Sequence, residues 1–457
     1  METTIAAVST AMSESGIGIV RISGPESVMI ADRIFRPADP KKSMMTSPSH
    51  TIHYGHIYDG DVMVDEVLLM LMKAPHTYTG EDTVEIDCHG GIQPVRRVLE
   101  TVLKNGAVPA GPGEFTKRAF LNGKMDLSQA EAVMDVITSK NEYALRSSEA
   151  QLKGSLRDRI RDIRQSVLHE TAFIETALDD PEHYDLAGYP EELKKKTEEQ
   201  IIKLDELIHS ASGGRIIKEG IRTVILGKPN AGKSSVLNVL LGESRAIVTE
   251  IAGTTRDTLE EYLNIGDVTL RICDTAGIHE PGDIVEEIGI EKAKKEARDA
   301  DLILLVIDSS SGLDENDEEI ISLLDTQKVI VLYNKTDLES VVDYDTICRR
   351  FSYPVIRISA KQNTGIRDLE EQIRNMFLKG HLSFNDEVFI TNIRQKKELE
   401  NARESLLLVI KGIESGLPED FLSIDLINAC ECLGNITGET TGEDLINEIF
   451  SKFCVGK

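Results

Sequence analysis

Short apolar runs and helix-like stretches alternate through the middle of the chain. The apolar runs have the length of buried strands, and they are Val268 to Cys273, Leu302 to Asp308, Val329 to Tyr333 and Val355 to Ile358. Strand-like and helix-like segments in alternation are typical of a mainly parallel β-sheet with helices on its faces. The pattern therefore predicts an α/β domain over residues 216–378.

Helical periodicity dominates the segments on either side, residues 119–215 and 379–457. Apolar residues recur at the spacing of one helix face in two sets: Ile201, Leu204, Leu207, Ile208 and Leu399, Ala402, Leu406, Val409, Ile413. The small residues from Ser210 to Gly214 predict a linker before the α/β domain. Two helical segments around a complete α/β unit indicate one helical domain with the α/β domain inserted into it. The alternative, two separate helical domains, leaves each with a smaller core.

The first part of the chain mixes strand-like and helix-like segments. Ile17 to Ile22 and Val67 to Met72 have strand character, while Pro94 to Lys104 has helix character. Residues that favour turns separate these segments. We therefore predict an N-terminal α+β domain over residues 1–118, and a multidomain chain of α/β and α type.

Composition and charge limit the partners. The 457 residues have the length of about three domains, and the net charge of −27 repels nucleic acid on average. An RNA partner must therefore bind a local basic patch. One candidate helix face consists of Lys153, Arg157, Arg161 and Arg164. Asp158 and Asp162 interrupt it, which favours an internally paired, solvated face.

The chain has no sign of export or membrane insertion. Its six cysteines lack the spacing of zinc ligands, which favours reduced thiols. Met1 to Ile5 carries no basic residue of a secretory signal, and apolar runs such as Leu302 to Ile307 are too short to cross a bilayer. We expect a soluble, cytoplasmic protein without a membrane partner.

A phosphate-binding loop stands at the start of the α/β domain. Gly227-Lys228-Pro229-Asn230-Ala231-Gly232-Lys233-Ser234 follows a strand-like run and precedes a helix-like one, as a P-loop does. Backbone N–H groups of such a loop surround phosphate oxygens, and the helix dipole favours the same anion. Lys233 can reach the outer phosphates and Ser234 can bind Mg²⁺. The sequence predicts a nucleoside triphosphate site.

The base is predicted to be guanine. Asn334-Lys335-Thr336-Asp337 closes a strand-like run, and one carboxylate such as Asp337 can accept both N–H donors that guanine presents side by side. Ser359-Ala360-Lys361 can support the base. Asp274-Thr275-Ala276-Gly277 and Thr254-Thr255-Arg256-Asp257 supply groups for Mg²⁺ and the terminal phosphate. Together, in this order, the motifs predict a GTPase.

The usual hydrolytic glutamine is missing. Ile278 follows Gly277, where Ras-type enzymes carry a Gln that orients water. Arg256 as an arginine finger and Glu286 as a water-orienting acid are the open alternatives. From the residues alone, a solvated arginine and an exposed acid at a helix start are favoured over both.

The motifs resemble those of the MnmE (TrmE) family of tRNA modification GTPases. The resemblance runs from end to end. It rests on the P-loop, Ile251 to Asp257, the terminal Phe453-Cys454-Val455-Gly456-Lys457, Gly111 to Phe115, Arg118 to Lys124, and Asp126 to Ala132. The terminal motif usually has Ile where this chain has Val455, which is a conservative change.

The resemblance implies an N-terminal folate-binding and dimerising domain, a helical domain and an inserted Ras-like G domain. It further implies a homodimer that joins the FAD-containing partner MnmG (GidA), in a heterotetramer, to modify carbon 5 of the wobble uridine of tRNA. The one-carbon unit comes from 5,10-methylenetetrahydrofolate. By position, the folate contacts are Arg21, Glu85, Lys124 and Lys457, and Cys454 is a catalytic candidate.

The resemblance also implies how GTP is hydrolysed. A K⁺ ion takes the place of an arginine finger, with Asn230, Thr249, Ile251 and Thr254 around it. Mg²⁺ binds Ser234 and Thr255, and Glu286 becomes the water-orienting acid. The predicted GTP-binding residues are Asn230, Ala231, Gly232, Lys233, Ser234, Ser235, Thr249, Thr254, Thr255, Asp274, Gly277, Asn334, Lys335, Asp337, Ser359 and Ala360.

Two other functions compete with this prediction. A ribosome-assembly or RNA-binding switch usually carries an RNA-binding module such as a KH domain, and no convincing module follows residue 380. A structural scaffold with a vestigial nucleotide site is disfavoured because Lys233, Ser234, Asp274 and Asp337 are all present.

Overall fold

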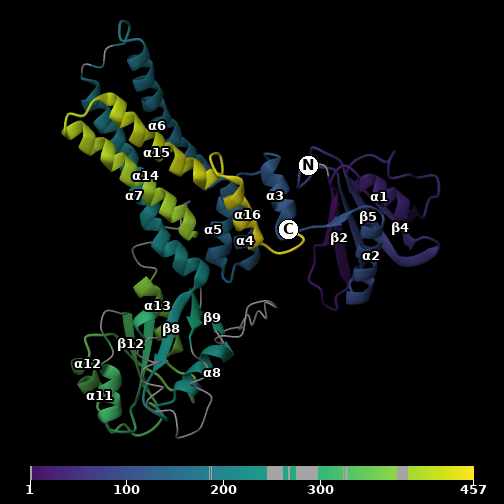
Figure 1. Cartoon of the computed structure of the whole chain (residues 1–457). Helices are drawn as coiled ribbons and strands as arrows, with labels where there is room; N and C mark the ends of the chain where they lie inside the picture. Colours follow the sequence, from purple (N-terminus) through teal and green to yellow (C-terminus); the bar gives the residue numbers. More distant parts are fainter. Residues whose placement is uncertain are drawn as a thin grey trace. The chain divides into compact units, whose positions relative to one another are not determined.

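The computed structural model describes residues 3–184, 186, 188–243, 261–265, 268–273, 297–322, 324, 328–377 and 390–457. The chain divides into two compact units. The first unit consists of residues 1–134, 157–164 and 431–457, and the second of residues 135–156 and 165–430. Figure 1 follows the helices and strands along the sequence.

A seven-stranded sheet, as far as the structure describes the chain, forms the core of the first unit in the order β3-β4-β5-β6-β2-β1-β7. The strands are β1 (Ile5–Val8), β2 (Ile17–Ser23), β3 (Phe35–Pro37), β4 (Thr51–Asp59), β5 (Val62–Met72), β6 (Thr83–His89) and β7 (Val108–Pro109). Helices α1 (Ser27–Ile34) and α2 (Ile92–Lys104) pack apolar side chains on one face of the sheet (Figure 1). The α+β prediction and its two strands and helix are confirmed.

The other face of this sheet carries exposed apolar side chains. Ile52 is 64% exposed, Tyr54 50% and Leu68 44%. The strand register sets Tyr54 opposite Leu68, and Leu68 opposite Asp87 on β6. Antiparallel sheets often bury one face and leave the other to water or to a partner. On this face, apolar side chains are exposed in a group, which is unusual for a surface that contacts only water.

Short helices join the sheet of the first unit to the end of the chain. They are α3 (Glu114–Leu121), α4 (Leu127–Thr138) and α16 (Glu443–Ser451). Leu127 and Ala130 of α4 pack with Ile449 and Phe450 of α16 in one buried cluster. Phe453 joins this cluster, with its ring 5.0 Å from that of Phe450. The residues after α16 are therefore anchored by apolar packing.

A mainly parallel sheet organises the nucleotide-binding part of the second unit. Its described strands, in the order β13-β12-β11-β8-β10-β9, are β8 (Ile221–Leu226), β9 (Glu261–Ile265), β10 (Val268–Ile272), β11 (Leu302–Asp308), β12 (Lys328–Asn334) and β13 (Val355–Arg357). Only β9 is antiparallel to its described neighbour. Apolar clusters cover both faces, with helices α8 (Lys233–Glu243), α11 (Glu315–Ile321), α12 (Tyr344–Arg350) and α13 (Ile366–Phe377). The predicted α/β fold is confirmed.

Long helices form the rest of the second unit. They include α5 (Glu142–Leu152), α7 (Tyr189–Glu219), α14 (Ile393–Glu414) and parts of α6 (Ser155–Asp179) and α15 (Glu419–Thr437). Helix α14 packs along α7, and the predicted apolar faces meet there, with Leu204, Leu207, Leu399 and Leu406 buried. The fold is therefore multidomain, as predicted, with helical segments before and after the α/β part.

The prediction of a linker from Ser210 to Gly214 is wrong, because α7 runs through these residues without a break. A Cβ on Gly214 would lie 2.2 Å from the carbonyl oxygen of Ile390. The Ile390 amide also donates to Ser210 Oγ at 3.2 Å. Small residues thus let the chain at residue 390 approach the helix closely, and this packing outweighs their low helix propensity.

Gly214→Ala tests this explanation. Alanine is the better helix former, but its methyl group would collide with Ile390, so we expect a loss of about 1–3 kcal/mol in the free energy of unfolding. Gly242→Ala is the matched control, since a Cβ on that α8 glycine meets nothing within 4 Å and should stabilise. Thermal unfolding followed by circular dichroism measures both variants. A melting temperature raised by Gly214→Ala would contradict the packing argument.

Candidate functional site

The candidate P-loop connects β8 to α8, in the strand-loop-helix setting that phosphate binding requires. The Lys233 ammonium donates hydrogen bonds to Gly227 O at 2.7 Å and to Lys228 O at 3.0 Å. Burial lowers the pKa of Lys233 below the usual value of a lysine. Bound phosphate would favour the charged ammonium, because an anion offsets the cost of burying it. The loop thus curls around the lysine that is predicted to bind the outer phosphates.

Three residues of the P-loop, Gly227, Asn230 and Gly232, have positive φ. Gly232 has φ +101°, and a Cβ there would lie 2.3 Å from Nδ2 of Asn334. Asn230 has φ +62°, a conformation that asparagine tolerates better than most residues. The second glycine of the motif is therefore required by the close approach of Asn334.

The side chain of Asn334 joins three predicted motifs. It is 1% exposed, and its Nδ2 donates to Ala231 O in the P-loop at 3.0 Å. Its Oδ1 accepts from the amide of Ala360 at 3.3 Å. One buried amide therefore sets the phosphate loop and the two base-binding loops at fixed distances from one another.

A cavity of about 540 Å³ opens beside these loops. Its lining residues are Gly232, Ser235, Asn238, Val239, Asn334, Lys335, Asp337, Leu338, Ala360 and Lys361. Sequence reasoning did not find Leu338, next to Asp337, or Asn238 and Val239, which lie on α8 and which no motif marks. The cavity has the size of a small-ligand site and brings the predicted base-binding residues together.

Asp337 is held ready to accept hydrogen bonds. Its Oδ1 accepts from Ser359 Oγ at 2.6 Å. This hydrogen bond, with a contribution from the charges of Lys361 and Lys335, lowers the pKa of Asp337 below its usual range. The carboxylate stays ionised at neutral pH, as recognition of two guanine N–H donors requires.

Lys228 fixes the P-loop to the start of α11, a role that sequence reasoning missed. Its ammonium contacts Asp317 Oδ2 at 2.8 Å, Asp314 Oδ2 at 3.0 Å and Gly312 O at 2.8 Å. The two aspartates form a capping box at the start of α11, whose spacing is readable in the sequence. Lys335 acts similarly on the base side and pairs with Asp308 at 2.6 Å.

Several predicted residues lie outside the described part of the chain. They are the magnesium and potassium candidates Thr249, Ile251, Thr254 and Thr255, the residues Asp274 and Gly277, and Glu286. Their roles stay predictions.

In the first unit, the structure brings together two of the predicted folate contacts. Arg21 on β2 and Glu85 on β6 are cross-strand partners, and Arg21 Nε lies 2.6 Å from Glu85 Oε1. Both side chains are about 15% exposed, at 15% and 16%. The Arg21 guanidinium lies 5.7 Å from the ring centre of Tyr78 and 5.5 Å from that of Phe115. An ion pair beside two aromatic rings suits a flat, polar heterocycle.

The C-terminal motif reaches the same ion pair. Arg21 Nη1 donates to the carbonyl of Gly456 at 3.3 Å, and Ser9 Oγ donates to the same oxygen at 3.1 Å. Cys454 is exposed, and its carbonyl accepts from Gly113 N at 3.2 Å. No signal local to Arg21 could have revealed this contact, because it spans almost the whole sequence.

The two predicted folate-binding lysines are less closely engaged. Lys124 donates to Pro75 O at 3.1 Å, in the loop that also carries Tyr78. Lys457 is half-buried at the end of the chain. The structure therefore brings Arg21, Glu85 and the terminal motif together, and sets Lys124 against the Tyr78 loop.

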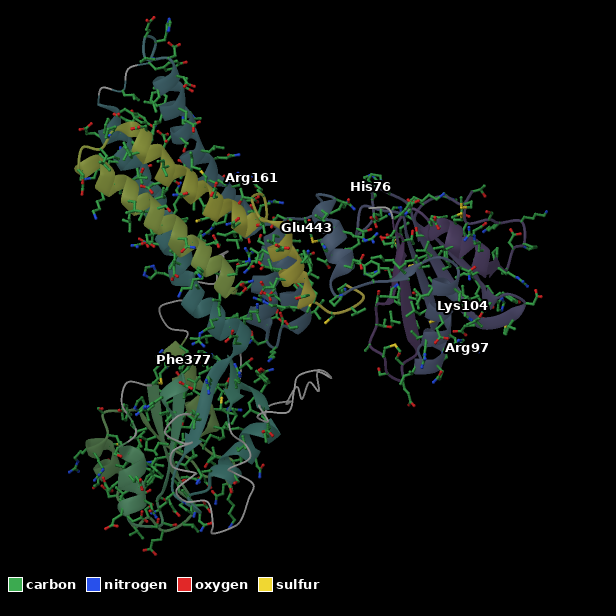
Figure 2. All side chains as sticks on the ribbon, in the orientation of Figure 1. His76, Arg97, Lys104, Arg161, Phe377 and Glu443 are labelled. Carbon is green, nitrogen blue, oxygen red and sulfur yellow. The ribbon has the colours of Figure 1, made fainter. Side chains whose placement is uncertain are left out.

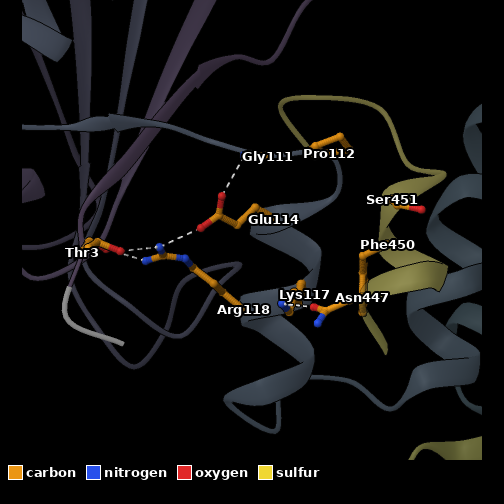
Figure 3. Close-up of a pocket in the computed structure, with 9 residues that line it drawn as sticks. All are labelled: Thr3, Gly111, Pro112, Glu114, Lys117, Arg118, Asn447, Phe450 and Ser451. Carbon is orange, nitrogen blue, oxygen red and sulfur yellow. Dashed lines mark hydrogen bonds and ion pairs between the residues drawn. The ribbon is translucent and has the colours of Figure 1, made fainter. Parts of the chain in front are cut away.

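The segment from Gly111 to Arg118 has a structural role (Figure 3). Arg118 is 1% exposed, and Figure 3 shows that it donates to Thr3 O, at 2.8 Å, and pairs with Glu114, at 2.9 Å. It also pairs with Glu81 at 3.1 Å. Glu114 also accepts from Gly111 N at 2.7 Å. These contacts line a cavity of about 460 Å³ and fasten the start of β1 to α3.

Known families match the whole length of this architecture. The family described as GTP-binding protein TrmE N-terminus matches residues 4–124, and the MnmE helical domain family matches residues 127–454. The tRNA modification GTPase MnmE of Lachnoclostridium phytofermentans is 54% identical and covers 99% of each chain. The chain belongs to the MnmE family of tRNA modification GTPases.

Other MnmE relatives agree. Those of Alkaliphilus metalliredigens and Geobacillus thermodenitrificans are each 47% identical, over 100% and 99% of both chains respectively. Among solved structures, the G domain of the T. maritima FeoB iron transporter matches 34% of this chain and 96% of its own, at 26% identity and a TM-score of 0.26.

Two of the four residues of the candidate basic face form ion pairs in this MnmE relative, one of them within the same helix. Arg157 contacts Asp158 at 2.8 Å, and Arg164 contacts Glu439 at 2.6 Å. Arg161, between them on α6, is exposed (Figure 2). This agrees with the paired, solvated face that the sequence favours. In the parts of the chain that can be described, no helix combines the length and apolar character needed to cross a membrane.

Asp337→Asn tests the base-binding residues. Asparagine keeps one acceptor but replaces the other by an N–H₂ donor that faces a guanine donor, so affinity for GTP should fall about 10- to 100-fold. Xanthosine triphosphate carries a carbonyl in place of that guanine amine and should bind the variant better than GTP does. Fluorescence titration with both nucleotides measures the change. If the variant still bound GTP more tightly than xanthosine triphosphate, Asp337 would not be the residue that recognises the base.

Proposed function

We propose that this GTPase of the MnmE family works in the modification of carbon 5 of the wobble uridine of tRNA. It would use a folate-borne one-carbon unit and an FAD-containing partner of the MnmG type. The observation that carries the proposal is the chain's full-length match to proteins named tRNA modification GTPase MnmE. The described GTP site, with its P-loop, Asn334 and Asp337, agrees with it.

Hydrolysis in this proposal depends on two cations. Ser234 and Thr255 would hold Mg²⁺, and Asn230, Thr249, Ile251 and Thr254 would hold K⁺. Hydroxyl, amide and carbonyl oxygens are suitable donors for such hard cations. Asn230 supports the assignment, because its side chain is exposed at the bend of the P-loop. When bound, the cations supply positive charge where negative charge develops between the phosphates. Glu286 would orient the attacking water in place of the missing Gln.

The folate would bind in the first unit. Glu85 can accept hydrogen bonds from a pterin edge, and Arg21 fixes its orientation through the 2.6 Å contact. Tyr78 and Phe115 offer flat apolar surface beside the ion pair. Lys124 and Lys457 would attract the glutamate tail of the cofactor. Cys454, exposed on the segment bound by Arg21, would act on the one-carbon unit or the uridine.

A second copy of the chain would cover the open sheet face of the first unit. Ile52, Tyr54 and Leu68 form its apolar part, and the cross-strand row from Leu68 to Asp87 leads toward the folate contacts. Burial and the nearby charge of Glu85 raise the pKa of Asp87, which eases its desolvation in an interface. The homodimer, joined by two MnmG-type subunits, would form the working complex in the cytoplasm.

The arrangement along the chain is part of the proposal. Residues 1–118 would form the folate domain, 216–378 the G domain, and 119–215 with 379–457 the helical domain around it.

Potassium dependence tests the cation site. GTP turnover should be at least about tenfold faster in KCl than in NaCl at equal ionic strength, since a missing charge-stabilising group commonly costs that much or more. Asn230→Ala should remove most of this difference. Release of phosphate measures the rates under conditions that allow dimerisation. Equal turnover of the unaltered protein in both salts would overturn the K⁺ assignment.

Cys454→Ser separates GTP hydrolysis from modification. We expect GTP turnover to stay unchanged and the modified wobble uridine to disappear from tRNA, as measured by nucleoside mass spectrometry of cells that carry only the variant. Cys348→Ser, which alters another exposed thiol on α12, is the matched control and should preserve both readouts. Normal modification with Cys454→Ser would exclude the thiol, and unchanged tRNA in cells lacking the whole protein would exclude the proposed function.

A further inference from the structure

A continuous chain of side-chain hydrogen bonds ties the edge of the nucleotide-binding sheet to the helices of the second unit. Asn264 on β9 donates from Nδ2 to Lys140 O at 2.9 Å. Thr269 on β10 donates to Asn264 Oδ1 at 2.7 Å and accepts from Asn141 Nδ2 at 2.9 Å. Asn141 Nδ2 also donates to Ile217 O at 3.2 Å. Each donor faces an acceptor, so the chain has one consistent direction.

Asn141 connects three elements with one amide. Its Oδ1 accepts from Ala144 N at 2.8 Å and caps the start of α5. Its Nδ2 reaches Thr269 on β10 and Ile217 in the last turn of α7. The ammonium of the preceding residue, Lys140, lies 2.9 Å from the ring centre of Tyr262 on β9. The α5 start and the α7 end are therefore both fixed to the β9–β10 pair.

The β9–β10 pair has a special place in the sequence. It lies between the two segments that are predicted to sense the terminal phosphate, Thr254 to Asp257 before β9 and Asp274 to Gly277 after β10. Asn264 and Thr269 are direct cross-strand partners at one end, while Glu261 and Ile272 pair at the other. Strand β10 then spans about 13 Å from Thr269 to Cys273, the residue before Asp274.

The hydrogen-bond network does not permit small, gradual shifts of the β9–β10 pair along its own axis. Thr269 is 2% exposed, and if the pair moved by one residue Asn141 would lose its bond to Thr269 and Asn264 would lose its bond to Lys140 O, while the bond between Thr269 and Asn264 would move with the strands. A buried polar group without a partner is costly, so such a network prefers either its complete form or a different complete arrangement. Packed contacts of this kind switch between discrete states rather than deform continuously.

We propose that the β9–β10 pair, through Thr269 and Asn141, transmits the nucleotide state of the GTP site to the facing ends of α5 and α7. The Thr269 hydroxyl connects the two parts, because it donates a hydrogen bond to Asn264 in the sheet and accepts one from Asn141 before α5. Asn141 is a positioning residue that acts through Thr269, and neither residue takes part in hydrolysis.

Thr269→Val tests the coupling in the full-length protein. Valine keeps the shape and strand preference of threonine but removes both hydrogen bonds. Hydrogen exchange of residues 140–148 and 212–220 is compared between the GDP state and the state with GDP and aluminium fluoride in KCl. We expect a clear difference in the unaltered protein and at least a twofold smaller difference in the variant. GTP turnover should change by less than about twofold, because the hydroxyl contacts neither the P-loop nor the base-binding loops and lies about 13 Å along the strand from Cys273.

Thr223→Val is the matched control. Thr223 is equally buried in the same sheet, but its hydroxyl donates to Ile221 O within its own strand, so the exchange difference should persist. Asn264→Ala, at a less buried position, repeats the test if Thr269→Val fails to fold. An exchange difference that survives both Thr269→Val and Asn264→Ala, or that is absent from the unaltered protein, overturns the coupling. If the unaltered protein did not hydrolyse GTP at all, that result would contradict the GTPase assignment instead.

Discussion

The buried amide of Asn334 is the contact on which the nucleotide site depends. It bonds to the P-loop at Ala231 and to the base-binding loop at Ala360, and it approaches Gly232 so closely that no side chain fits there. The loops follow different parallel strands, whose carboxyl ends meet at one edge of the sheet. The sheet delivers the loops to one place, and this single amide sets their spacing. Lys228 and Lys335 then hold the two sides against α11 and β11.

Much of this site could be predicted because its motifs are local. The P-loop, the Asn334 to Asp337 segment and the periodicity of the strands each depend on neighbours in sequence, and the structure sets them as expected. Lys228, Asn238 and Val239 were missed because their roles arise only when distant segments pack. The prediction of a linker at Gly214 was wrong for the same reason. A close contact with Ile390 outweighs the low helix propensity of the small residues in this part of α7.

In the first unit, by contrast, most of the residues around the candidate site come from distant parts of the sequence. The resemblance supplied Arg21 and Glu85 as two of four folate contacts, and the strand register of β2 and β6 explains why these two meet. Tyr78, Phe115 and the Gly456 carbonyl, which complete the surroundings, come from three separate parts of the chain. Arg118, which the motif marks as strongly as any functional residue, instead holds the start of β1 in a buried ion-pair cluster. A motif can therefore mark a residue that is needed for the structure as well as one that is needed for the chemistry.

The two bonds to the Gly456 carbonyl span 447 and 435 positions of the chain. A ribosome adds about 5–20 residues per second, so it needs about 20–90 s after making Arg21 before Gly456 can emerge. During synthesis the sheet of the first unit can form, but Arg21 and Ser9 lack their hydrogen bonds to the Gly456 carbonyl until then. The contacts around Arg21 are therefore completed only long after the strand that carries this residue has been made.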